Sequence, residues 1–404
     1  MFGKTTRAVV LGAFAGAVLA AGPAIAQDVK IGAIMPLTGD LQDFGNSDVK
    51  GVRLAVEEIN EQGGVLGEEL DLVVGDTRTS PQAGVDAARK LVNVENVAGL
   101  VGALSSGVTI PIARSVSSEE GVPQISNAST SPVITNLEDN GYLFRTVPSD
   151  SLQGLVLGNI VYDKGLRKVS TLYVNNDYGE GLANVFRKQF EKRGGEVLAN
   201  LPYEKGKASY RGELGKASQG GAEALLLIAY PENGITIIRQ GLEEGYFDRF
   251  IFTDGMKTPK VVQQIGGEYL ANSLGSTPTS VASAGADHFK AAYEAKFGEL
   301  PPKPFIDTAY DAAYLLALAI EKAGTTQGSK VRDALHEVAN PPGETVTAGE
   351  WRKAKELLAA GKDINFEGAS GPHDFDEHGD VPGVIEEWKF TADGGVETVR
   401  KITK

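Results

Sequence analysis

The stretch "VGALSSGVTIPIA", residues 101–113, begins as a buried strand and becomes a helix within a few residues. An apolar run ends at Leu104, two serines and a glycine follow, and apolar residues then recur at helical spacing. A strand that passes directly into a helix is the repeating unit of a parallel sheet covered by helices. If the unit recurs along the chain, the fold is α/β.

The same unit does recur, in two successive series. Near-continuous apolar runs of this kind predict parallel sheets with helices on both faces, so we expect two doubly wound α/β lobes. The first series has apolar runs at 29–37, 70–77, 97–104 and 122–126, with helical stretches at 48–61, 81–93 and 106–119. The second series has runs at 143–147, 169–175, 196–201, 224–230 and 250–254.

The remainder of the chain predicts three further features. Residues 272–285 are rich in Ser, Thr and Gly, which is typical of a linker. Residues 306–323 predict a long helix. Residues 383–390 and 396–402 predict an antiparallel pair of strands joined at "ADGG".

The N-terminus predicts export. Lys4 and Arg7 precede an apolar stretch, 8–22, and then the small-residue sequence Ala24-Ile25-Ala26. This order is typical of a cleaved signal peptide, residues 1–26, and predicts a periplasmic protein. The 404-residue chain contains no cysteine, so we expect neither disulfides nor a lipid anchor.

Composition and charge limit the class of partner. Hydrophobic residues make up 42% and charged residues 23% of the chain, which is ordinary for a globular protein. The net charge of −14 becomes −16 when Lys4 and Arg7 are lost with the signal peptide. A charge of this sign argues against nucleic acid and anionic membranes as partners.

Common signatures of catalysis and cofactor binding are missing from the sequence. The chain has no Walker-type phosphate loop, HExxH motif, GxSxG elbow or cysteine nucleophile, and no GxGxxG follows a strand. The segment "HDFDEHGD", 373–380, crowds histidines among acids, but its spacing puts Ile385 where a calcium loop requires Glu. We interpret it as a solvated turn, and we expect no metal, no cofactor and no enzyme activity.

Ligands of parallel sheets bind beyond the carboxyl ends of the strands, so the residues there are the candidates. Ser106 and Thr130 follow two such strands and are suited to hold an anion together with helix N-terminal amides; the alternative is that they only cap helices. Asp254 is suited to pair with a cation, or is a turn acid before Gly255. Four aromatic residues form either pocket walls or ordinary core: Phe44, Tyr178, Tyr230 and Phe305.

Segments spread over the mature chain resemble one family. They are "IGAIMPLTGDLQDFGNSDVKGVRLAVEEINEQGGVLGEELDLVVGDT" (31–77), "LVGALSSGVTIPIA" (100–113), "ISNASTSP" (125–132), "NNDYGEGLANVF" (175–186) and "AYPENG" (229–234). They are similar to the periplasmic leucine/isoleucine/valine-binding proteins, which supply ABC importers. The resemblance implies two lobes joined by a three-crossover hinge, with the ligand trapped as the lobes close. The implied parts are 27–147 and 276–362 for lobe 1, and 148–275 and 363–404 for lobe 2.

The resemblance also implies roles for individual residues. Ser106 and Thr130 would bind an α-carboxylate through hydroxyl and backbone N–H groups, with Ser105 beside them. The carbonyl of Ala128 and the hydroxyl of Thr130 would accept from an α-ammonium group. Asp254 stands where the family usually has Glu before Gly, so its shorter side chain requires a closer cleft or a bridging water.

The aromatic candidates take the places of pocket-forming residues of the family. Phe44 stands where the family often has Tyr, Tyr178 belongs to "YGEG", and Phe305 precedes the long helix at 306–323. Tyr230 matches the second of two adjacent aromatics, the first being Ala229 here.

The sequence thus predicts a monomeric binding protein that captures a branched-chain or related amino acid and delivers it to an ABC permease of the inner membrane. Two alternatives stay open: a sensory protein of the same fold, and a binder of amides or aromatic acids. An exported enzyme is the less favoured class, because no nucleophile–base pair is present.

Overall fold

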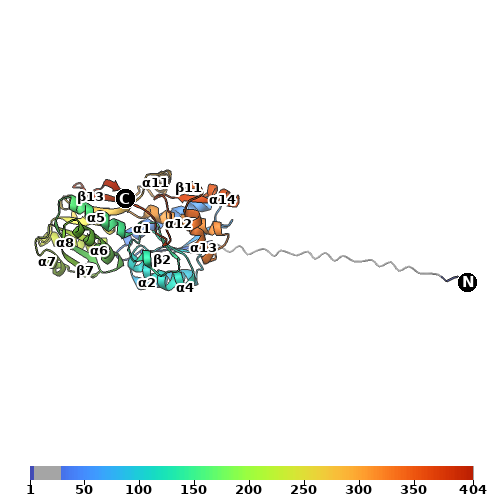
Figure 1. Cartoon of the computed structure of the whole chain (residues 1–404), viewed down its shortest axis with the longest axis horizontal. Coiled ribbons are helices and arrows are strands. Elements are labelled where there is room, and N and C mark those ends of the chain that lie inside the picture. Colours follow the sequence, from blue (N-terminus) through green and yellow to red (C-terminus); the bar gives the residue numbers. More distant parts are fainter. Residues whose placement is uncertain (4–28, 404) are drawn as a thin grey trace.

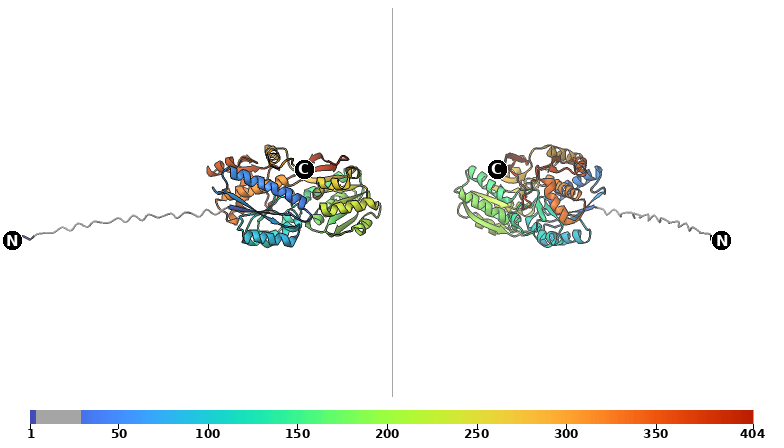
Figure 2. Two further views of the ribbon diagram at one scale, coloured as in Figure 1. Left: turned by 180° about the vertical axis from the view of Figure 1, so that it is seen from behind. Right: turned by 45° about the vertical axis from the view of Figure 1, so that its right-hand side comes forward.

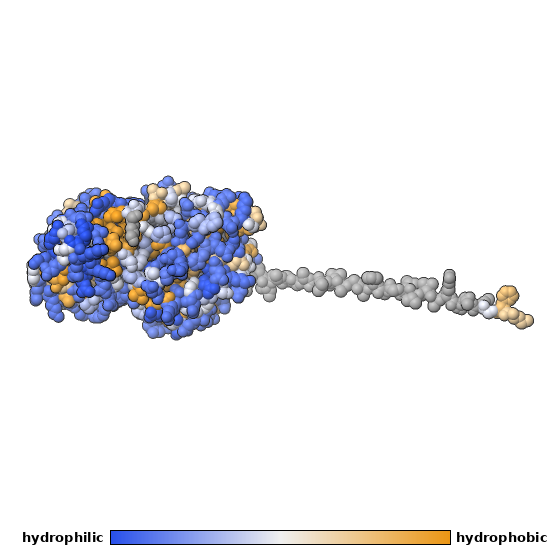
Figure 3. All heavy atoms as spheres, in the orientation of Figure 1, coloured by the Kyte–Doolittle hydropathy of each residue, from blue (hydrophilic) through white to orange (hydrophobic). Residues whose placement is uncertain are grey.

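The computed structural model describes residues 1–3 and 29–403, and residues 29–403 form two lobes that lie side by side (Figure 1). Most of the predicted signal peptide, residues 4–26, lies outside the described residues. Within the described part of the chain, no helix combines the length and apolarity needed to cross a bilayer. Polar side chains cover most of the face in Figure 3, and an apolar band lies near the junction of the lobes.

Lobe 1 is built on a five-stranded sheet in which all strands are parallel. Its order is β2 (Leu70–Asp76), β1 (Val29–Met35), β3 (Leu100–Gly102), β4 (Gln124–Ser126) and β5 (Leu143–Arg145). Alternate side chains face opposite layers: Ile34 packs in one cluster with Leu91 of α2 (Pro81–Asn93), while Ala33 packs with the residues of α1 (Gln42–Glu61) and α12 (Ile306–Ala323). Two-sided burial explains why the central strands β1 and β3 are largely apolar.

Lobe 2 is built on a seven-stranded sheet. Its order is β14 (Val396–Ile402), β13 (Val384–Phe390), β10 (Leu274–Thr279), β9 (Phe250–Phe252), β8 (Ala224–Ile228), β6 (Lys168–Val174) and β7 (Glu196–Tyr203). The five strands from β10 to β7 are parallel, and β13 is antiparallel to both of its neighbours. The predicted antiparallel pair is therefore confirmed.

The predicted linker at 272–285 is only partly right: β10 occupies its first half, and residues 280–283 lie on the passage between the lobes that follows β10. The sequence of β10, LGSTPT, is rich in loop-forming residues, yet it pairs with β9 on one side and β13 on the other. A side chain at Gly275 would lie 2.4 Å from the Trp388 indole, so the small residue is what admits this tryptophan. Pairing with two strands that are distant in the sequence therefore outweighed the loop-forming composition of this segment.

The chain passes between the two sheets three times, and both views in Figure 2 show the lobes joined along one side. The passages follow β5, β10 and β12 (Ile364–Glu367). The predicted helix from 106 is continuous but contains a π turn: α3 (Ser106–Ile112), η1 (Ala113–Ser117) and α4 (Ser118–Glu120). The remaining elements are η2 (Ile134–Asn136), α5 (Asp150–Asp163), α6 (Asp177–Lys192), α7 (Arg211–Ala217), α8 (Pro231–Glu243), η3 (Asp254–Met256), α9 (Pro259–Ile265), α10 (Gly267–Leu270), α11 (Ala284–Phe297), α13 (Gly328–Ala339), β11 (Glu344–Thr347) and α14 (Trp351–Ala359).

Candidate ligand-binding site

The carboxyl ends of strands from both sheets meet in the cleft between the lobes. From lobe 1, Ser105 and Ser106 follow β3, and Ala128 follows β4. From lobe 2, Tyr230 follows β8, and Asp254 follows β9. Because β3 and β4 are parallel to each other, as are β8 and β9, these segments emerge at one edge of each sheet, where α/β proteins bind ligands.

Eight of the nine predicted site residues line one small cavity. They are Phe44, Ser105, Ser106, Ala128, Tyr178, Tyr230, Asp254 and Phe305, joined by Leu41, Leu104 and Gly255. Its volume is about 20 Å³, which is room for a single water molecule. The lobes are therefore in contact across the cleft, with little space left between them.

Thr130, the ninth predicted residue, does not line the cavity. Its hydroxyl donates to Oδ2 of Asp150 at 2.8 Å, and its carbonyl accepts from the Asp150 amide at 2.7 Å. Since Asp150 begins α5 of lobe 2, Thr130 links the lobes directly.

The hydroxyls of the two serines after β3 form hydrogen bonds with other segments of the chain. Ser105 is the N-cap residue of α3, but its hydroxyl forms no capping bond and lies 2.9 Å from the Tyr230 hydroxyl of lobe 2. The Ser106 hydroxyl accepts from the Ser131 amide at 3.2 Å. The helix-cap alternative is therefore wrong for the Ser106 side chain.

Two tyrosines form the lobe 2 wall. The rings of Tyr178 and Tyr230 are stacked, with centroids 5.8 Å apart and planes 10° from parallel. The Tyr230 hydroxyl also accepts from Asn176 at 3.0 Å, and the Tyr178 hydroxyl donates to Asp254 at 2.9 Å. Burial raises the pKa of both phenols, so both are neutral. The wall thus presents two apolar ring faces, and hydrogen bonds fix the hydroxyl end of each ring.

Two phenylalanines of lobe 1 complete the cavity. Phe44, from the first turn of α1, is 1% exposed, and Phe305 precedes α12. Phe305 has a φ of 82°, which is strained for a bulky residue. Its carbonyl accepts from Asn127 Nδ2 at 3.3 Å and from Thr308 Oγ1 at 3.0 Å. These bonds hold the strained residue whose ring reaches the cavity.

Asp254 is the acid of the cavity and is almost fully buried. Its Oδ1 accepts from Gln153 Nε2 and from the Tyr178 hydroxyl, both at 2.9 Å. Burial raises the pKa of Asp254 to about 6 despite these bonds. Gly255 permits the tight turn, because a side chain there would lie 2.4 Å from the Ala229 carbonyl.

A second buried acid, Asp150, lies near the first and was not predicted. It is fully buried, and its pKa is raised well above the usual value, first by burial and then by the negative charge of Asp254. Its Oδ1 has no hydrogen-bond partner within residues 1–3 and 29–403. In the sequence, an acid directly after the N-cap Ser149 is ordinary in a first helical turn, so it carried no specific signal.

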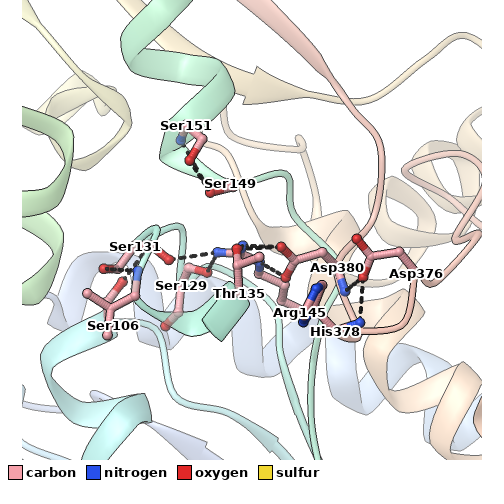
Figure 4. Close-up of polar contacts among 11 residues, drawn as sticks. Ser106, Ser129, Ser131, Thr135, Arg145, Ser149, Ser151, Asp376, His378 and Asp380 are labelled. Carbon is pink, nitrogen blue, oxygen red and sulfur yellow. Dashed lines mark hydrogen bonds and ion pairs between the residues drawn. The ribbon is translucent and has the colours of Figure 1, made fainter. Parts of the chain in front are cut away.

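Arg145 holds the loop that contains Ser129 and Ser131 (Figure 4). The guanidinium is fully buried, and its Nε and Nη2 each donate to Asp380 at 2.6 Å. Nη1 donates to the carbonyls of Ser129 at 3.4 Å and Ser131 at 3.0 Å, and Nη2 also donates to Thr135 at 2.9 Å. A guanidinium has five N–H donors, and all five are used. Because a trans peptide points its N–H opposite to its carbonyl, the bond to Ser129 directs the Thr130 amide away from Arg145.

The prediction of a solvated turn at 373–380 is wrong at both ends of the segment. His373 is 1% exposed, and burial lowers its pKa to about 3, so the ring is neutral. Asp380 is buried against Arg145, and its amide donates to Asp376 at 3.0 Å. The pattern of His and acids arises from packing and a buried ion pair, which no local spacing reveals.

Comparison with known proteins agrees with this architecture. Residues 28–380 match the family model described as "Periplasmic binding protein". The chain belongs to the periplasmic binding protein family. One relative is a leucine-, isoleucine-, valine-, threonine- and alanine-binding protein of Pseudomonas aeruginosa. It is 31% identical to this periplasmic binding protein, and the match covers 77% of this chain and 82% of the relative.

This periplasmic binding protein is also similar to a second relative and to a solved structure. The substrate-binding protein BasB of a chemotactic signal transduction system of Halobacterium salinarum is 28% identical over 85% of this chain and 83% of its own. The crystal structure of the branched-chain amino acid transporter substrate-binding protein LivJ of Streptococcus pneumoniae, in complex with isoleucine, has a TM-score of 0.78 and 26% identity, covering 94% of this chain and 100% of that one. The predicted fold, two lobes of the type I periplasmic binding class, is confirmed.

Proposed function

We propose that this protein captures a free amino acid, branched-chain or related, between its lobes. One observation carries the proposal: a buried carboxylate of lobe 2, Asp254, lines the same cavity as the hydroxyl-bearing strand end of lobe 1 at Ser105 and Ser106. A zwitterionic amino acid would supply an ammonium group to pair with Asp254 and a carboxylate to bind at Ser105 and Ser106. A buried acid beside a ligand that is only an anion would be costly.

The walls of the cavity favour an apolar side chain. Phe44 and Phe305 on lobe 1 and the stacked Tyr178 and Tyr230 on lobe 2 surround the space next to the polar groups. The cavity of about 20 Å³ is smaller than any amino acid, so binding requires the lobes to separate. A ligand that contacts both lobes would then stabilise one closed arrangement.

The family and the relatives support delivery to a membrane partner. We propose export to the periplasm through the signal peptide at residues 1–26, action as a monomer without catalysis, and docking of the closed form on an ABC permease. The chemotactic relative of Halobacterium salinarum favours a second candidate, a sensor that presents the closed form to a membrane receptor. In both cases the ligand chemistry is the same.

A thermal-shift panel tests the ligand class. Protein freed of bound ligand by unfolding and refolding is melted with each of the twenty standard amino acids. It is also melted with 4-methylpentanoate, which is leucine without its amino group, and with 3-methylbutylamine, which is leucine without its carboxyl group. A ligand at 100 times its Kd stabilises by about 2.7 kcal/mol. We expect a shift with leucine or another amino acid of the panel, and none with either truncated compound. Equal shifts with the acid that lacks an amino group would contradict the role of Asp254.

A further inference from the structure

A second cavity lies where the chain passes between the lobes. Its volume is about 290 Å³, compared with about 20 Å³ for the ligand cavity, the small cavity that Asp254 lines. We call it the hinge cavity, because all three passages between the lobes contribute to its walls. These wall residues are 146–148, 278–281, 370, 372 and 381–384. The hinge cavity therefore offers the space that the ligand cavity lacks.

The hinge cavity is suited to an uncharged, apolar group. More than half of the residues that line it are aliphatic, aromatic or proline. The charged groups of its lining are already paired: Lys257 with Glu386, Lys303 with Asp43 at 2.6 Å, and Asp307 with the hydroxyl of Ser280. Pockets that hold small organic molecules have volumes of about 300 Å³ or more and mainly apolar walls. In size and lining, the hinge cavity meets this description.

Phe305 lies between the two cavities. Among the residues that the structure describes, it is the only one that lines both. Its neighbours Pro304 and Ile306 line the hinge cavity but not the ligand cavity. Phe305 itself is 6% exposed, so it is packed on all sides. This residue therefore forms the partition between the ligand cavity and the hinge cavity.

The backbone on both sides of Phe305 is anchored to lobe 1. Before it, Lys303 Nζ donates to the carbonyl of Asp43 at 3.1 Å, in addition to pairing with the Asp43 carboxylate. After it, Thr308 Oγ1 donates to the carbonyl of Asn127 at 2.8 Å. The segment cannot retreat without breaking these bonds. The partition therefore stays in place when a ligand occupies the cleft.

We propose that Phe305 sets the largest amino acid that this protein accepts, because it closes the ligand cavity off from the hinge cavity. The inference rests on the proposed function, since it assumes an amino acid held by the polar groups of the ligand cavity with its side chain at the aromatic walls. Without the Phe305 ring the two cavities would join. A side chain longer than that of leucine would then extend into the hinge cavity, where each buried methylene lowers Kd about fourfold.

Straight-chain amino acids of increasing length test this proposal. Norvaline, norleucine, 2-aminoheptanoate and 2-aminooctanoate share one ammonium and one carboxylate group, so differences in Kd report the space for the side chain. They are titrated calorimetrically into the wild-type protein and into Phe305→Gly. Glycine adopts the φ of 82° without strain, and the carbonyl of residue 305 keeps its bonds to Asn127 and Thr308.

The wild-type protein should gain no affinity from the longest side chains. In Phe305→Gly the Kd of 2-aminooctanoate relative to that of norvaline should fall at least about tenfold below the wild-type ratio, because three more methylenes are buried. Phe305→Ala also removes the ring and carries the same test if Phe305→Gly fails to fold.

Leu300, a partly buried wall residue of the hinge cavity, supplies two controls. Leu300→Ala widens the hinge cavity but leaves the partition, so the wild-type dependence on chain length should be kept. Leu300→Trp refills the cavity and should remove the gain when combined with Phe305→Gly. If the wild type binds short chains and Phe305→Gly shows the same length dependence or binds none, the inference is overturned and the proposed function stands. A wild-type protein that binds no amino acid would overturn both.

Discussion

Replacing Asp254 with Asn should make the unliganded protein more stable at neutral pH. Burial raises the pKa of this carboxyl from 3.8 to about 6. A group whose folded-state pKa is raised binds its proton more tightly in the folded protein, so ionising it above pH 6 costs stability. The difference of about two pH units corresponds to about 3 kcal/mol. Asn removes this cost and keeps an oxygen that accepts from Gln153 and Tyr178.

The sign of the effect fixes its dependence on pH. In the wild-type protein the cost is fully present well above pH 6 and has mostly disappeared at pH 4, where Asp254 is protonated in the folded state and partly protonated in the unfolded state. At pH 8 we therefore expect Asp254→Asn to raise the free energy of unfolding by about 3 kcal/mol, or Tm by about 4 °C for a chain of this length. At pH 4 the difference between the two proteins should fall below about 1 kcal/mol.

The assay is calorimetric unfolding of the ligand-free proteins at intervals from pH 4 to pH 8. Asp248→Asn, at an exposed position before β9, is the matched control and should change stability by less than about 0.5 kcal/mol. The same Asp254→Asn protein should bind its amino acid about 10- to 100-fold more weakly, because a charge-assisted hydrogen bond is lost. A variant that melts at or below the wild-type temperature at pH 8, or a difference as large at pH 4 as at pH 8, would refute the reasoning.

Two further sets of variants test lobe 1. Ser106→Ala should weaken every carboxylate ligand about 10- to 100-fold in calorimetric titrations, while unfolding of the ligand-free protein loses only about 1 kcal/mol, for the one hydrogen bond of this hydroxyl; unchanged affinity would remove the Ser106 hydroxyl from the site. Arg145→Met should cost about 3–5 kcal/mol in denaturant unfolding, because it leaves Asp380 buried without its partner. Adding Asp380→Leu should recover most of that loss, and no recovery would mean that the pair is not the source of the stability.

The regular alternation of apolar runs and helical stretches along the sequence made much of the fold predictable. The helices at 81–93 and 306–323 have the bounds that the sequence pattern predicts, because each has apolar periodicity and a local signal at one end: Pro81 begins the first and Gly324 follows the second. The strand β10 was missed because its identity depends on partners far along the chain, at 250–252 and 384–390. The composition of residues 272–285 gives no information about those partner strands.

The sequence by itself determined which segments reach the cleft. Parallel strands must end at one edge of their sheet, so the residues after β3, β4, β8 and β9 were identifiable from apolar runs alone. Only the tertiary structure decided how they meet. It placed Thr130 against Asp150 rather than in the cavity wall, and it set Asp150 near Asp254. The physical reason is that burial and the pairing of charges are properties of surfaces brought together by the two lobes, which no single segment encodes.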